Sequence, residues 1–227
     1  MTEYNIINGN IFHAEYDTQR EIAMTFFRMA EYYESPHKEI YRKVFTFEQF
    51  LDCYTDDDGY FPYFELWPAF NIPGEFVDEF HDKFGVTYDL TQREKNLHWL
   101  IKKHMGYKDY YLIGNIKHNT EDYDHELCHA LYYTNPEYRA KANELVKNMP
   151  ISDTAMLSQM LIEMEYPDND EIMIDELNAY LSTNSIATWE SVDYFNISFG
   201  QVEHLVGPFI EAFQNMKRQI TVTKILD

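Results

Sequence analysis

Two histidines four residues apart, with a glutamate directly after the first, are the residues best suited to chemistry. His125, Glu126 and His129 form the pattern HExxH. In a helix, positions i and i+4 lie on one face about one turn apart, so both imidazoles can bind one metal ion. The glutamate can then act as a general base toward a water molecule. No proline or glycine interrupts residues 120–134, so a helix is expected there.

The region 110–134 resembles the zincin metallopeptidases, in which an edge strand lies beside the HExxH helix and pairs with an extended peptide substrate. A short apolar and aromatic run at 109–115 predicts a strand, and Tyr110 to Gly114 would be that edge strand. The resemblance covers at most a third of the chain. It implies Zn²⁺ held by His125 and His129, Glu126 as the general base, and a peptide or protein as substrate.

A zincin needs a third protein ligand. The metzincin pattern HExxHxxGxxH fails here, because Tyr132 stands at the glycine position and Asn135 at the third histidine. The remaining common solution, found in the gluzincins, is a glutamate from a later helix. The candidate segment is 172–181.

Helix geometry favours Glu176 within this segment. Asp175 falls on a polar stripe of the helix, together with Glu171, Asn178 and Ser182. Glu176 falls on a different stripe, whose other members are expected to pack inward: Ile172, Ala179 and Tyr180. A carboxylate on an inward face needs a partner, since burying an uncompensated charge is costly. Glu176 is therefore the predicted third metal ligand.

A further tyrosine or histidine often stabilises the oxyanion in such enzymes. Tyr180, Tyr194 and His204 all lie downstream of the motif. Tyr180 is preferred as a catalytic residue because it follows Glu176 by one helical turn. Its other possible role is packing.

The elements around these residues predict an α+β fold dominated by helices, with a small β-sheet. Asn8–Gly9 suits a type I′ turn, so residues 4–14 should form a hairpin. Capping and periodicity signals predict helices at 18–34, 47–54, 73–84, 92–105, 120–133, 136–147, 153–165, 170–181 and 201–218. One domain over 1–227 is expected, with an N-terminal hairpin and helices in 1–105 and the metal-binding catalytic region in 106–227.

Charge restricts the possible partners. The chain has 18 Lys and Arg against 39 Asp and Glu, a net charge of −21, and no Lys or Arg lies between Lys147 and Lys217. Nucleic acid is a poor ligand for such a chain, because lysine and arginine supply affinity for phosphates. A substrate with basic residues near the cleaved bond fits better. The oligomeric state is left open.

The composition and the site leave alternatives. Two cysteines without a CxxC pattern exclude a disulfide scaffold or cysteine zinc finger, and no signal peptide or membrane-spanning segment is evident, so a cytoplasmic location is expected. The charge of −21 would also suit a non-enzymatic decoy for a basic surface. Two histidines and a carboxylate suit iron as well as zinc, which allows a different enzymatic reaction.

Overall fold

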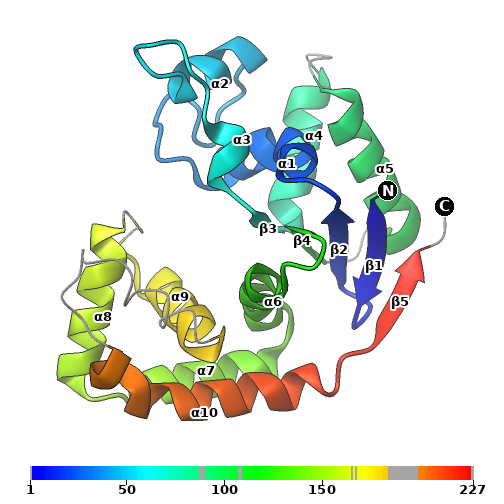
Figure 1. Cartoon of the computed structure of the whole chain (residues 1–227). Helices are drawn as coiled ribbons and strands as arrows, with labels where there is room; N and C mark the ends of the chain where they lie inside the picture. The colour runs from blue at the N-terminus through cyan, green and yellow to red at the C-terminus, as the bar shows by residue number, and fades with distance from the viewer. Residues whose placement is uncertain are drawn as a thin grey trace. The chain divides into compact units, whose positions relative to one another are not determined.

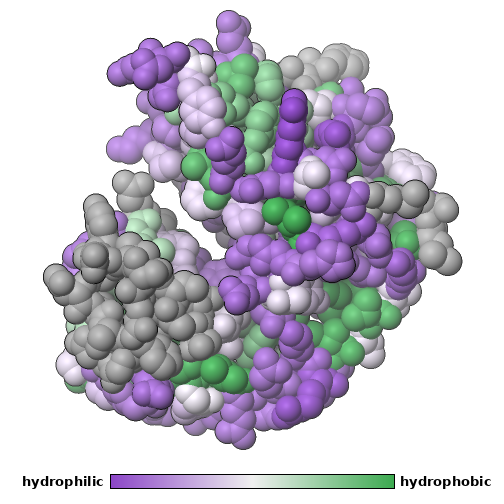
Figure 2. All heavy atoms as spheres, in the orientation of Figure 1, coloured by the Kyte–Doolittle hydropathy of each residue, from purple (hydrophilic) through white to green (hydrophobic). Residues whose placement is uncertain are grey.

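The computed structural model describes residues 2–86, 90–106, 109–164, 166, 168–183 and 199–225. It is an α+β structure, mostly helical, with one five-stranded mixed sheet, as the sequence predicts. The chain divides into two compact units, one formed by Met1–Tyr123 with Thr221–Asp227 and the other by Asp124–Ile220. We call these the sheet unit and the helical unit (Figure 1). Hydrophilic side chains predominate on the face drawn in Figure 2, in keeping with the high charge.

The sheet unit begins with the predicted hairpin. Asn8 and Gly9 both have positive φ, 52° and 77°, as a type I′ turn requires. The strands of the sheet lie in the order β3-β4-β2-β1-β5, where β1 is Glu3–Ile7, β2 is Ile11–Tyr16, β3 is Ala69–Pro73, β4 is Tyr111–Ile116 and β5 is Val222–Ile225. The last strand returns from the far end of the chain and pairs antiparallel with β1.

The expectation that the strand before the motif lies at an edge is wrong. β4 pairs with β2 in parallel and with β3 in antiparallel orientation, so it is an inner strand. β3, which occupies the edge, was not predicted because it lies among turn formers: Pro68 precedes it, Pro73 is its last residue and Gly74 follows. Five consecutive residues of β4 are buried, as expected for an inner strand covered on both faces.

Helices of the sheet unit are α1 (Gln19–Glu34), α2 (Phe47–Tyr54), α3 (Tyr63–Leu66), α4 (Gly74–Val86) and α5 (Gln92–Met105). Thr18 caps α1, and the predicted capping boxes open α2 and α5. α1 packs on one face of the sheet, where Phe26 stacks on Phe70 at a centroid distance of 5.4 Å. Gly114 permits this packing, because a Cβ atom there would lie 2.5 Å from the Phe26 ring.

A buried ion pair joins α1 to α5. The Arg28 guanidinium donates two hydrogen bonds to Glu94, at 2.9 and 2.7 Å, and both side chains are fully buried. Glu94 also accepts the backbone N–H of Thr91 as part of the capping box. The charges are thus paired and hydrogen-bonded, which is what their burial requires.

The helical unit consists of most of α6 together with α7, α8, α9 and α10; their bounds are Thr120–Thr134, Pro136–Lys147, Ile151–Glu163, Asp170–Thr183 and Phe199–Lys217. Its apolar core draws on α7, α8, α9 and α10, including Leu157, Leu177 and Phe209. The predicted start of α8 at Asp153 is two residues late, because α8 begins directly after Pro150. Its predicted end, Glu165, lies outside the described residues. No helix in the described part of the chain is both long and apolar enough to span a membrane.

Candidate metal centre

The motif lies on α6, whose start is well defined. The Asn119 side chain accepts the backbone N–H of Asp122, which satisfies one of the free donors at the helix N-terminus. Asp124, next to the motif, accepts two hydrogen bonds of 2.6 and 2.7 Å from Lys217 of α10. Leu127 and Cys128, between the two histidines, are fully buried. The helix is therefore held by hydrogen bonds before the motif and by buried side chains within it.

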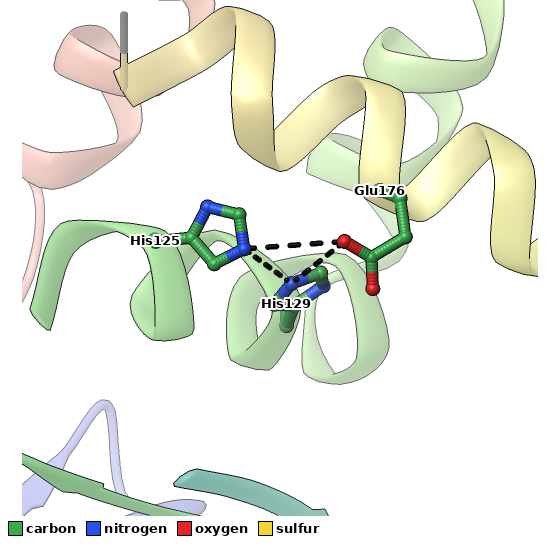
Figure 3. Close-up of side chains that lie close together, drawn as sticks. All are labelled: His125, His129 and Glu176. Atoms are coloured by element: carbon green, nitrogen blue, oxygen red, sulfur yellow. Dashed lines mark hydrogen bonds and ion pairs between the residues drawn. The ribbon is translucent and has the colours of Figure 1, made fainter. Parts of the chain in front are cut away.

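Three predicted ligands converge in the helical unit. His125 and His129 project from α6, and Glu176 projects toward them from α9 (Figure 3). The two Nε2 atoms are 3.2 Å apart, and Oε2 of Glu176 lies 3.9 Å from that of His125 and 3.7 Å from that of His129. These three residues could hold a metal ion.

The separations fit a small ion. Zinc bonds of ~2.0 to 2.2 Å in tetrahedral geometry place neighbouring ligand atoms about 3.3 to 3.6 Å apart. The observed 3.2, 3.7 and 3.9 Å require only side-chain adjustments of a few tenths of an ångström. Three protein ligands leave a fourth position open, which is the arrangement of catalytic rather than structural zinc sites.

The surroundings of Glu176 also favour a cation at this cluster. Its Oε2 atom is buried and has no hydrogen-bond partner among the described residues. Burial raises the pKa of the Glu176 carboxyl to about 7, and the nearby charges of Asp175 and Glu126 add to the increase, while His129 opposes it. A buried acceptor without a donor is costly. A cation bound between this oxygen and the two histidines would remove that cost.

The two histidines differ in their electrostatic surroundings. Burial, together with the neighbouring His129, holds the pKa of His125 well below its ordinary value. Burial also acts to lower the pKa of His129, but the carboxylates of Asp175 and Glu176 outweigh it and raise the pKa well above the ordinary value. A neutral His125 is already in the form that binds metal, whereas His129 must release its proton first.

Asp175 is a functional candidate that the sequence analysis missed. Its Oδ2 lies 3.0 Å from Nδ1 of His129, on the ring nitrogen opposite the one that faces Glu176. Metal-binding histidines commonly donate this second N–H to a carboxylate, which fixes the tautomer and the ring orientation. The helical pattern had assigned Asp175 to an outward polar stripe, and that assignment is wrong.

The rest of that stripe explains the error. Asn178 and Ser182 are buried, where Tyr138 of α7 donates to the Asn178 side chain at 3.2 Å and Ser182 donates to the same oxygen at 3.3 Å. Ile172, expected to be buried, is 37% exposed. Asn178 and Ser182 face inward because a neighbouring helix supplies a hydrogen-bond partner, which single-helix periodicity does not reveal, whereas Glu171 of the same stripe is exposed.

Tyr180 lies beside the histidines. Its ring packs edge-on against His125 at a centroid distance of 4.7 Å. Its hydroxyl is 3.0 Å from that of Tyr166, and burial with the charges of Glu176 and Glu126 raises its pKa to about 12. Tyr166, which precedes α9, was not singled out by the sequence analysis because no motif marks it.

The other sequence candidates fall into three situations. Glu126 is partly buried, and its charge raises the pKa values of Glu176 and His129, so its carboxylate is within electrostatic reach of the cluster. His204 lies 3.2 Å from Asp153, and no described contact joins it to the three ligands. Tyr194 lies outside the described residues.

No protein-family model, curated protein or solved structure matches this chain significantly.

Proposed function

We propose that this protein is a zinc-dependent metallopeptidase of the gluzincin type. The observation that carries the proposal is the convergence of two Nε2 atoms and one carboxylate oxygen within 3.9 Å of one another, with Glu126 next in sequence to the first histidine. His125, His129 and Glu176 would be the protein ligands. Zn²⁺ would supply a Lewis acid that lowers the pKa of the attacking water and polarises the scissile carbonyl.

Glu126 is the proposed general base. It takes a proton from the attacking water while the water oxygen forms a bond to the carbonyl carbon. The carbon–nitrogen bond of the substrate then breaks, and Glu126 returns the proton to the leaving amine. Tyr180 is proposed to contribute a hydroxyl to the developing oxyanion, in line with its position beside His125.

The substrate is proposed to be a peptide or protein with basic residues. Asp168, Asp170 and Glu171 are exposed at the start of α9, the helix that carries Glu176. Negative charge near a reaction site attracts cationic groups and disfavours anionic ones. Peptide libraries with lysine or arginine near the scissile bond are therefore the first substrates to try.

Metal content is the decisive measurement. Elemental analysis of protein purified without added metal and without a His tag should give about one zinc per chain, lost in His125→Ala. Iron in place of zinc would indicate an oxidative reaction at the same ligands. Absence of metal, and no uptake when zinc is offered, would contradict the proposal and leave an acidic protein that binds basic partners as the better interpretation.

A further inference from the structure

Tyr166 is held at a defined place next to the metal cluster. It lies between α8 and α9, and its backbone N–H donates to the carbonyl of Leu161 at 3.0 Å. Its half-buried ring packs against the apolar core of the helical unit, as does the ring of Tyr180. Tyr166 is thereby attached to the end of α8.

The hydroxyl of Tyr166 lies near two residues at the candidate metal site, Tyr180 and Glu176. It lies 3.0 Å from the Tyr180 hydroxyl. It also acts to lower the pKa of the Glu176 carboxyl, as a hydrogen-bond donor near that carboxylate does. Because Oε2 of Glu176 has no hydrogen-bond partner among the described residues, Oε1 is the oxygen available for this bond. One carboxylate oxygen is then held by a protein donor, and the other faces the two histidines.

The contact between Tyr166 and Tyr180 leads to α6, the helix that carries the two histidines. If Tyr166 donates its single proton to Glu176, its oxygen can accept the proton of Tyr180. The Tyr180 ring in turn contacts His125 of α6. A chain of contacts thus joins one ligand on α9 to another on α6, and chains of hydrogen bonds of this kind strengthen one another.

We infer that Tyr166 is a positioning residue of the metal centre, holding Glu176 and, through Tyr180, His125 in the arrangement that binds the ion. The inference rests on the proposed function only in that it requires a metal at this cluster. Groups that hold metal ligands in this way typically contribute 10- to 100-fold to metal affinity. A purely structural role would instead depend on the ring, which Tyr166→Phe retains.

The test compares tyrosine-to-phenylalanine variants of the full chain. Zinc affinity is measured by competition with a chromophoric chelator, and the visible spectrum of the Co²⁺ form reports ligand geometry. Tyr166→Phe should bind zinc about 10-fold or more weakly and change the Co²⁺ spectrum. Tyr180→Phe should have a smaller effect, because the bond from Tyr166 to Glu176 remains.

A matched control is available on α6. Tyr132 donates a 2.8 Å hydrogen bond to Asn143, so Tyr132→Phe loses a comparable bond that does not involve the three ligands. Its zinc affinity should stay within about two-fold of wild type. Unchanged affinity in Tyr166→Phe, or equal losses in Tyr166→Phe and Tyr132→Phe, would overturn the inference. If Tyr166→Phe does not fold, unchanged zinc affinity and Co²⁺ spectrum in Tyr180→Phe would overturn it.

The outcomes also separate this inference from the proposed reaction. A wild-type protein that binds zinc but cleaves no peptide would contradict the reaction, while the affinity series would still support or refute the role of Tyr166. A wild-type protein that takes up no zinc, Co²⁺ or other divalent metal would overturn both.

Discussion

Nδ1 of His129 lies 3.0 Å from Oδ2 of Asp175, while Nε2 of the same ring faces the carboxylate of Glu176. Two adjacent residues of α9 thus contact the two nitrogens of one imidazole. Asp175 accepts the Nδ1 proton, which leaves the Nε2 lone pair directed at the cluster. In the proposed metal site, Asp175 would orient a ligand and Glu176 would bind the ion.

Asp175→Asn should weaken zinc binding by about 10- to 100-fold, because the amide is a poorer acceptor for the Nδ1 proton and fixes the tautomer less firmly. Zinc competition titrations of the two proteins would measure this change. Asp170→Asn is the matched control, since Asp170 is an exposed carboxylate on the same helix. Equal affinity in Asp175→Asn and wild type would show that the His129 contact does not serve the metal.

Glu126→Gln should retain zinc and lose about 10²- to 10⁴-fold in kcat, because the amide cannot accept the proton of the attacking water. Cleavage of a peptide library and elemental analysis of the same preparation provide the two measurements. Glu144→Gln, which alters an exposed glutamate paired with Lys141 on α7, should match wild type in both. Full activity in Glu126→Gln would exclude it as the general base.

Zinc affinity should increase steeply between pH 6 and pH 8. The Glu176 carboxyl has a pKa of about 7 and the pKa of His129 is raised, so both groups hold protons that zinc must displace at the lower pH. Each displaced proton contributes up to about 10-fold per pH unit below its pKa. Titrations at pH 6, 7 and 8 would measure the slope, and a flat profile would argue that these groups are not the ligands.

The metal-free protein should show a complementary effect on stability. The folded state keeps the Glu176 proton up to pH about 7, whereas an ordinary glutamate releases it near 4.5, so the wild type loses stability as pH rises between these values. Glu176→Gln does not ionise. From pH 5 to pH 8 its free energy of unfolding should therefore improve relative to wild type by about 2 kcal/mol.

Urea unfolding in EDTA at the two pH values measures this difference. Glu171→Gln, at an exposed position of the same helix, is the control variant. A stability difference between Glu176→Gln and wild type that is the same at pH 5 and pH 8 would mean that the Glu176 carboxyl titrates normally.

Gly114→Ala tests the packing of the sheet unit. Its Cβ would meet the Phe26 ring at 2.5 Å and the Ile22 side chain at 3.2 Å, and overpacking of this kind costs about 1 to 3 kcal/mol. Gly85→Ala is the control, because its Cβ would meet only Leu90, at 3.9 Å, within helix α4. Thermal unfolding should lower the Tm of the first variant and leave that of the second unchanged or slightly raised.

Local signals in the sequence were sufficient for most elements. The Asn8–Gly9 turn, the Thr46 and Thr91 capping boxes and the uninterrupted motif helix each depend on neighbours within four residues, which a single sequence contains in full. The spacing of His125 and His129 likewise determined that both imidazoles share one helix face. Glu176, from a distant helix, was selected as a carboxylate on an inward face, and the structure brings it near the two histidines.

Only the tertiary structure decided which other groups surround the site and where the strands lie. β3 covers the edge of β4 although its sequence has few strand signals, because pairing with β4 supplies backbone hydrogen bonds that no local pattern encodes. Asp175 faces His129, and Asn178 faces Tyr138, because a partner distant in the sequence contacts one oxygen of each side chain. The direction in which a polar helix residue points is set by the partners that pack against it, and these are known only once the helices are assembled.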